Sequence, residues 1–221
     1  MKRLYFLALP LLAMIPAKVS AQYYEIANQI PSLLSPALSG SLSYKGYVDV
    51  VLLPGVGHNR ANDVGISTTQ GFQYTSWFYM GVGVGVDLMM AQQPDGWQPD
   101  PDYDYTYYGS AKRKAMIPVF SDFRFNIGDR SSVSCFIDIK LGAAWLLGRD
   151  YLRMADGFMS NNTQFFMRPA IGVRIPVSSK NPKQAFNIGL TYQLLTSNNN
   201  YYWSSNSLTL NNFGITLSYE W

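Results

Sequence analysis

The end of the chain, from Phe213 to Trp221, alternates strictly between apolar residues and small or polar ones. This period of two predicts a β-strand with two different faces. In a soluble sheet the apolar face points to a core, whereas in a transmembrane barrel it points to lipid. The apolar face consists of Phe213, Ile215, Leu217, Tyr219 and Trp221.

The same alternation recurs upstream and predicts eight strands after residue 40. They span residues 42–53, 64–74, 78–90, 115–127, 133–146, 165–177, 185–195 and 208–221. A change of phase between Leu210 and Phe213 predicts a β-bulge at Asn211 and Asn212. The connections alternate in length, and the longer ones cover 54–63, 92–114, 147–164 and 196–207. This alternation is typical of an up-and-down barrel with external loops at one end, and a Greek-key sandwich gives no reason for it.

The charges within the predicted strands all lie in the phase opposite to the bulky apolar residues. A lipid-facing Lys or Arg near mid-bilayer would cost roughly 2–4 kcal/mol, so this phase is expected to face the lumen. In a soluble sandwich the same charges would face solvent, and the charge pattern alone leaves that alternative open. The predicted lumen charge network is balanced in sign and consists of Lys45, Asp49, Asp87, Asp122, Arg124, Asp138, Lys140, Arg168, Arg174 and Glu220.

An eight-stranded barrel has an interior that side chains fill. Tyr47, Tyr79 and Phe120 share the inward phase with the charges, so we predict an ion-paired and nearly closed lumen. Inward glycines such as Gly83 and Gly142 would make room for bulky neighbours, and they keep a narrow or gated path open as the alternative.

The N-terminus predicts an exported protein. Lys2 and Arg3 precede an apolar run that is too short to span a bilayer, and Val19-Ser20-Ala21 forms a small-residue cleavage site, so residues 1–21 are expected to be a signal peptide. The peptide carries three of the 17 basic residues and none of the 14 acidic ones, which leaves 17 − 3 = 14 of each sign in the mature chain. This neutral balance gives no reason to expect nucleic acid as a partner.

Composition agrees with a membrane barrel. Charged residues make up 14% of the chain and hydrophobic ones 48%, yet the mean hydropathy is −0.05, so apolar residues are dispersed among polar ones. The lone Cys135 is expected to be a small packed or lipid-facing residue. Residues 22–40 contain Pro31 and Pro36 and are expected to form short helical turns in a periplasmic segment, with a plug or docking arm as the alternative.

The chain resembles the small outer-membrane β-barrels of Gram-negative bacteria, of the OmpA and OmpX types within the porin-like barrels, over residues 41–221. The resemblance implies an all-β, eight-stranded antiparallel up-and-down transmembrane β-barrel in the outer membrane. It also implies lipid and the barrel-assembly machinery as partners. In that family the barrel-assembly machinery reads a signal in the last strand, which ends in an aromatic residue. The last strand of this chain resembles that signal, with Phe213, Ile215, Leu217, Tyr219 and Trp221 in the corresponding positions. No side-chain motif accompanies the resemblance, so it implies a fold and no activity.

The external loops are expected to carry any interaction. Aromatic rings beside carboxylates could stack on a glycan or bind a protein partner. The alternating carboxylates Asp100, Asp102 and Asp104 could also supply oxygen ligands to calcium, although this signal is weaker. The alternative places the rings in the interfacial aromatic belt and Lys112 to Lys114 against anionic head groups. The candidate residues are Trp97, Asp100, Asp102, Asp104, Tyr105, Tyr107, Tyr202 and Trp203.

Catalytic interpretations find little support in the sequence. The only histidine, His58, lies in the first external loop without an evident partner. The Gly81-Val82-Gly83-Val84-Gly85 run lacks the third glycine and the helix of a dinucleotide-binding motif. We therefore predict a non-enzymatic barrel with a structural or surface-interaction role and without cofactor or metal. A narrow channel or transport-associated barrel is the alternative.

Overall fold

The computed structural model describes residues 43–57, 60–92, 110–148, 151–152, 163–178, 181–201 and 204–221. The predicted signal peptide, the segment 22–40 with its expected helical turns, and most of two external loops lie outside the described residues. Within the described residues the structure contains strands and turns and no helix.

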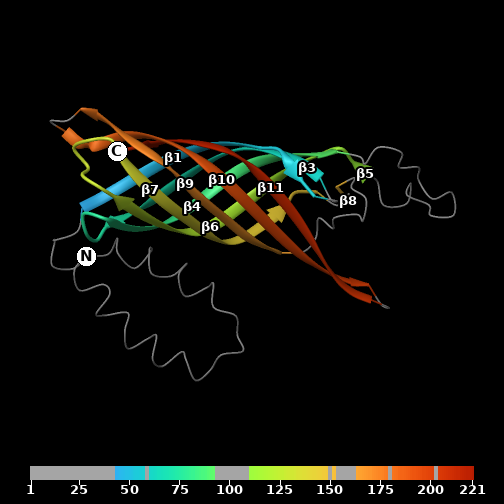
Figure 1. Cartoon of the computed structure of the whole chain (residues 1–221). Helices are drawn as coiled ribbons and strands as arrows, with labels where there is room; N and C mark the ends of the chain where they lie inside the picture. Colours follow the sequence, from blue (N-terminus) through green and yellow to red (C-terminus); the bar gives the residue numbers. More distant parts are fainter. Residues whose placement is uncertain are drawn as a thin grey trace, which may run out of the picture.

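Eight long antiparallel strands form one closed sheet, shown on its side in Figure 1. Each long strand pairs with the next one in the chain, and β1 pairs with β11 to close the barrel. The prediction of an eight-stranded up-and-down barrel is therefore confirmed. The long strands are β1 (Ser43–Leu53), β3 (Arg60–Gln73), β4 (Phe78–Gln92), β6 (Arg113–Ile127), β7 (Ser134–Leu146), β9 (Gln164–Ser178), β10 (Asn181–Tyr201) and β11 (Ser204–Glu220).

Three two-residue strands lie at the end of the barrel that carries the longer connections. The strand β2 (Gly55–Val56) pairs antiparallel with β11. The strand β5 (Ser110–Ala111) pairs in parallel with β8 (Tyr151–Leu152). The opposite end carries the short turns at 74–77 and 128–133 together with the C-terminus (Figure 1). We call these the loop end and the turn end.

The turn between β6 and β7 follows from its own side chains. Gly128 has a φ of 113°, a conformation that suits glycine, and the next residue is Asp129. The Asp129 carboxylate accepts hydrogen bonds from the backbone N–H and the hydroxyl of Ser131, at 2.9 and 2.7 Å. These two bonds lower the pKa of Asp129 below its usual value. Local capping of this kind makes a short turn at this end stable.

The seam between the first and last strands is closed by the terminal tryptophan. Trp221 donates its backbone N–H to the carbonyl of Gly46 at 3.1 Å, and its carbonyl accepts from the Gly46 N–H at 3.2 Å. A Cβ on Gly46 would lie 2.3 Å from the Trp221 ring, so the indole packs against the bare glycine backbone. The last aromatic residue therefore covers the seam at the turn end.

Two predicted loops are shorter than expected. Strand β3 begins at Arg60 rather than 64, and the segment 196–207, predicted as an external loop, is mostly β-hairpin. Its residues pair in one register from Thr196↔Thr209 to Tyr201↔Ser204, and the hairpin extends well beyond the neighbouring strands in Figure 1. The Ser- and Asn-rich sequence lacks apolar alternation, which suggested a loop, but backbone pairing across a hairpin does not require that alternation.

The predicted bulge at Asn211 and Asn212 is wrong. The pairs from Leu195↔Leu210 to Tyr192↔Phe213 follow one another without an extra residue. The pairing of Val56 with Asn211 continues the register of β1 with β11. Leu210 is simply an inward residue with 0% exposure, because the lumen is apolar at that level. The inward face of β11 therefore changes from apolar at Leu210 to polar at Asn212, and this change explains the shift of apolar phase in the sequence.

The outer surface of the barrel is a continuous apolar belt. Every long strand contributes at least one large exposed apolar side chain, for example Val86 on β4, Ile171 on β9 and Ile188 on β10. Aromatic residues gather at the turn end, where Trp77, Phe78 and Phe125 pack together with ring centroids 5.2–6.1 Å apart. An apolar band bounded by aromatic rings is the exterior of a transmembrane barrel. Among the described residues no helix is long and apolar enough to cross a membrane.

We expect Ile188→Lys to lower the free energy of unfolding in lipid vesicles by about 2–4 kcal/mol. Ile188 is exposed in the belt and pairs with Leu217 and Val173, which are also exposed and apolar. Its lysine replacement would place a charge in hydrocarbon. The control is Gln184→Lys, an exposed position nearer the turn end, which should cost about 0–1 kcal/mol. Equal costs in urea titrations would contradict the lipid-facing assignment.

Candidate functional site

The interior of the barrel contains many buried polar and charged side chains. All the charged residues predicted to face the lumen are buried, with exposures between 0 and 4%. They lie on β1, β4, β6, β7, β9 and β11 and form three groups along the barrel axis, which we call the turn-end, central and loop-side clusters.

The turn-end cluster consists of Lys45, Arg130, Arg174 and Glu220. Glu220 forms ion pairs with Lys45, with Arg130 and with Arg174, whose Nε lies 2.8 Å from Oε2. Arg174 also donates to the backbone carbonyl of Arg130 at 2.8 Å. Lys45 and Glu220 come from the first and last strands, so this cluster joins the two sides of the seam by charge as well as by backbone.

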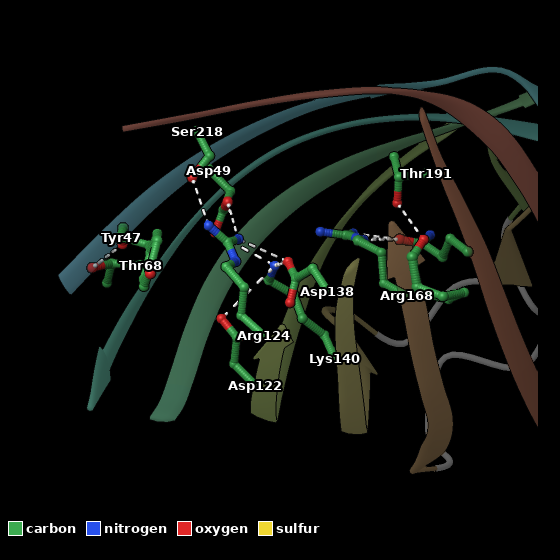
Figure 2. A network of polar contacts seen from close by, with 12 residues as sticks. Tyr47, Asp49, Thr68, Asp122, Arg124, Asp138, Lys140, Arg168, Thr191 and Ser218 are labelled. Atoms are coloured by element: carbon green, nitrogen blue, oxygen red, sulfur yellow. Dashed lines mark hydrogen bonds and ion pairs between the residues drawn. The ribbon is translucent and has the colours of Figure 1, made fainter. Parts of the chain in front are cut away.

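The central cluster consists of Asp49, Asp122, Arg124, Asp138 and Lys140 (Figure 2). The Arg124 guanidinium lies 2.8 Å from Asp138 and 3.3 Å from Asp49. Lys140 pairs with Asp138 and lies 3.6 Å from Asp49 and 3.9 Å from Asp122. Alternation along strands that meet at one level of the barrel brings these residues together, since Asp122 pairs across the sheet with Lys140 and Arg124 with Asp138.

The loop-side cluster consists of Asp63, Asp87, Arg168 and Gln193. Arg168 pairs with Asp87 and lies 3.5 Å from Asp63, and its Nε donates to the Gln193 side-chain oxygen at 2.8 Å. The Gln193 amide in turn donates to Asp63 at 2.7 Å. One arginine and one amide therefore bridge two carboxylates.

Aromatic rings fill the space between the charged groups. The Arg124 guanidinium lies 3.9 Å from the centre of the Tyr47 ring, and Tyr47 packs edge-on against Tyr79 at 4.8 Å. Phe120 lies between Gly83 and Gly142 in the sheet, and a Cβ on Gly83 would come within 2.5 Å of its ring. Inward glycines thus make room for inward rings, as their positions in the sequence indicated.

An apolar layer lies in the lumen toward the loop end. Its side chains are buried and come from seven of the eight long strands, so it spans most of the barrel cross-section. We call it the apolar layer; its members are Ala61, Met89, Met116, Phe120, Ala144, Leu146, Phe166, Leu195 and Leu210. Apolar constrictions of this kind exclude water and ions from a pore.

Sequence reasoning missed three lumen charges. Asp63 was placed in the first external loop, but it lies in β3 with 0% exposure. Lys114 was grouped with Lys112 as a residue that contacts head groups, and that grouping is wrong for Lys114, which is buried. Arg130 belongs to the β6–β7 turn and reaches back to Glu220. The inward phase of Asp63 matches Ser67 and Thr69, and this match was the available signal.

The external-loop candidates lie outside the described residues. They are Trp97, Asp100, Asp102, Asp104, Tyr105, Tyr107, Tyr202 and Trp203, together with His58. Among the described residues, no group of three or more His, Cys, Asp or Glu side chains is placed to hold a metal ion.

The predicted assembly-signal residues lie on the outer face of β11. Phe213, Ile215 and Leu217 are exposed, whereas Tyr219 and Trp221 are half-buried. Tyr219 packs between Phe186 and Trp221, with ring centroids 5.2 and 6.2 Å away. The strand therefore ends in a lipid-facing aromatic stack at the turn end.

Comparison with solved structures identifies the fold. The chain aligns with Neisserial surface protein A at a TM-score of 0.50 and 9% sequence identity, over 81% of this chain and 97% of that one. It aligns less closely with the outer-membrane enzyme PagL, at a TM-score of 0.46 and 14% identity over 79% of this chain and 97% of that one. OprG of Pseudomonas aeruginosa aligns at 0.41 and 10% identity, over 81% and 95%.

No protein-family model matches the chain, and no curated protein matches it. At these identities the structural likeness concerns the fold. With its apolar exterior and charged interior, the chain is a small transmembrane β-barrel of the outer-membrane type, as the sequence predicted.

Proposed function

We propose that this outer-membrane barrel has a closed lumen and acts as a rigid scaffold that presents its external loops for surface interaction. The observation that carries the proposal is the filling of the lumen. Three ion-paired clusters and an apolar layer follow one another along its axis. An interior filled in this way leaves the loop end as the part that is free to contact other molecules.

The cost of opening the lumen supports the closed state. Solute passage would separate buried pairs such as Arg124 with Asp138 and leave each charge without its partner. Breaking a buried pair in this way costs about 3–5 kcal/mol. The solute would also have to wet the apolar layer around Leu195 and Leu210.

The loop end offers more surface than the turn end. The β10–β11 hairpin continues beyond its pairing with β9, which ends at Thr196↔Phe165, so its outer part forms a two-stranded ribbon. The sequence between β4 and β5 adds carboxylates and aromatic rings, including Trp97, Asp102 and Tyr105. A glycan or an extracellular protein is the partner that this chemistry suits.

The same proposal includes the lipid and assembly partners. The exposed side chains of β11 contact outer-membrane lipid, and the terminal aromatic pattern serves the barrel-assembly machinery. It assigns no catalytic role and no cofactor, because the single histidine, His58, has no evident partner in the sequence and the glycine run 81–85 is not a complete dinucleotide-binding motif. Turnover of a lipid or peptide substrate that disappears in His58→Ala would contradict this part.

A narrow channel is the second candidate, and the polar lumen favours it. Several buried atoms of the lumen, including both carboxylate oxygens of Asp122 and the hydroxyl of Tyr79, have no hydrogen-bond partner among the described residues. Such atoms favour internal water. Water there would reach the apolar layer from one side only.

We expect refolded wild-type protein to show no defined conductance step in planar bilayers. The apolar layer provides the physical reason, and an inserted porin in the same membrane serves as the positive control. The in-chain control is the double variant Leu195→Ser and Leu210→Ser, in which the layer would become polar and brief openings would appear. A reproducible wild-type step that boiling of the sample abolishes would contradict closure and favour the channel.

The surface role has a separate test. Replacing residues 93–109 with a short Gly-Ser linker should abolish binding of the refolded barrel to host-cell glycans or matrix proteins on arrays. The heat-modifiable gel band, which reports the folded barrel, should persist because β4 ends at Gln92 and β6 begins at Arg113, so the replacement leaves all eight long strands intact. Equal binding by the intact and shortened chains would exclude this loop as the interacting part.

A further inference from the structure

The turn-end cluster contains more positive than negative charge. Lys45, Arg130 and Arg174 converge on the single carboxylate of Glu220, so the cluster carries three positive charges against one negative charge. The nearest acid along β1 is Asp49, but it pairs with Arg124 and Lys140 of the central cluster. Buried charge in a low-dielectric interior requires a counter-charge, and among the described residues of this cluster Glu220 supplies one.

Hydrogen bonding shows the same imbalance. Lysine and arginine offer three and five donors and no acceptor, whereas a carboxylate oxygen has two lone pairs. Oε1 of Glu220 accepts from Lys45, from Arg130 and from Arg174, the last at 3.2 Å. Oε2 accepts from Arg174 Nε at 2.8 Å. Three cationic residues therefore compete for one oxygen atom, and additional acceptor oxygens would relieve that competition.

Two neutral side chains beside Arg174 are buried and have no partner. Ser134 on β7 and Asn187 on β10 lie directly opposite Arg174 across the sheet, one on each side. They are 5% and 1% exposed. Within the part of the chain that the structure describes, the Ser134 hydroxyl and both polar atoms of the Asn187 amide make no hydrogen bond. Buried polar groups are normally satisfied, so these atoms indicate a missing partner at this level of the lumen.

We propose that the turn-end cluster binds a phosphate group, with Lys45, Arg130 and Arg174 as cationic ligands and Ser134 and Asn187 as neutral donors. A tetrahedral oxyanion supplies several acceptor oxygens and negative charge together, which is what the cluster lacks. Arginine forks match phosphate geometry, and Glu220 holds all three cations in place.

The site has access to solvent at the turn end. Arg130 belongs to the β6–β7 turn, and its side chain is 16% exposed, whereas Arg174 and Glu220 are fully buried. A phosphate would enter past Arg130 and meet Arg174 deeper in the lumen. This site does not depend on whether the lumen conducts, because it lies below the central cluster and the apolar layer.

Phosphorus NMR tests the proposal directly. The refolded full-length barrel in maltoside micelles, which contain no phosphorus, should broaden the resonance of inorganic phosphate. Sulfate should reverse the broadening, and chloride at equal ionic strength should not. Arg130→Gln should weaken binding about tenfold or more, because it removes a charged donor. The matched control Arg113→Gln removes an exposed arginine at the opposite end and should bind like wild type.

Three results would overturn the site. They are a phosphate resonance that shows no broadening, broadening that chloride reverses as well as sulfate does, and broadening by Arg130→Gln that equals that by wild type. Ser134→Ala provides a variant that keeps every charge, and the heat-modifiable band confirms its fold. It should weaken binding severalfold, and unchanged affinity in Ser134→Ala would refute Ser134 as a ligand.

The source of the phosphate has its own experiment. In nanodiscs of anionic phospholipid, a lipid head group that fills the site would prevent the broadening by added inorganic phosphate. Persistent broadening there would identify free phosphate as the ligand. Both results support a phosphate site, and the micelle experiment alone decides whether it exists.

Discussion

Replacing Arg124 with methionine should lower the free energy of unfolding by about 3–5 kcal/mol. The Arg124 guanidinium is the centre of the central cluster, where it pairs with Asp138 and Asp49 and lies over the Tyr47 ring. Methionine fills similar volume but leaves the three buried carboxylates of the cluster with Lys140 as its remaining cation. Urea titrations in lipid vesicles, followed by tryptophan fluorescence, measure the change.

Two further variants separate charge from packing. Arg113→Met removes an exposed arginine and should change stability by at most about 0.5 kcal/mol. Adding Asp138→Asn to Arg124→Met should recover part of the loss, because it reduces the excess of carboxylates over cations in the cluster. A cost of less than about 1 kcal/mol for Arg124→Met would mean that water or a proton compensates the cluster, and the account of an ion-paired lumen would fail.

Gly172→Val should prevent most of the protein from folding. A Cβ at this position would lie 2.1 Å from the carbonyl oxygen of Ile188 and 2.5 Å from the Cα of Gly189. Both contacts are with backbone, so no side-chain rotation relieves them. The seam between β9 and β10 would have to separate at a cost of about 3 kcal/mol, the upper end of the usual range for overpacking. The heat-modifiable fraction after refolding measures the loss.

Two comparisons show whether the backbone contact is the cause. Ala143→Val adds volume on the outward face of β7 and should refold like wild type. Gly83→Ala meets the ring of Phe120 rather than backbone, and Phe120→Leu in the same chain should restore its folding. Efficient refolding of Gly172→Val would show that the two strands can move apart freely at this level.

Alternation along the chain was sufficient to predict the barrel, because lipid outside and charge inside impose a period of two. Lys45 and Glu220 could therefore be placed in the lumen from the sequence, although their pairing could not. Which charges meet depends on the stagger of strands far apart in the chain. Periodicity in one strand does not contain that information.

The errors have a common cause, which is the assumption that an inward position is polar and a polar run is a loop. Leu210 faces the apolar layer, so its phase suggested a bulge that does not exist. Asp63 and the Asn-rich segment after Thr196 were assigned to loops because they lie in mainly polar runs of the sequence. Backbone pairing continues through both, and sequence composition does not report it.

Closure between β1 and β11 also constrains how the protein is made. Lys45 and Glu220 are 175 residues apart in sequence, so the contacts that complete the cylinder are among the most distant in the chain. Such contacts carry a large loop-closure entropy and slow folding. Until β11 arrives, every partial barrel has two unpaired edges that can pair with other chains. Fidelity of biogenesis thus depends on keeping nascent molecules apart until synthesis of the final strand is complete.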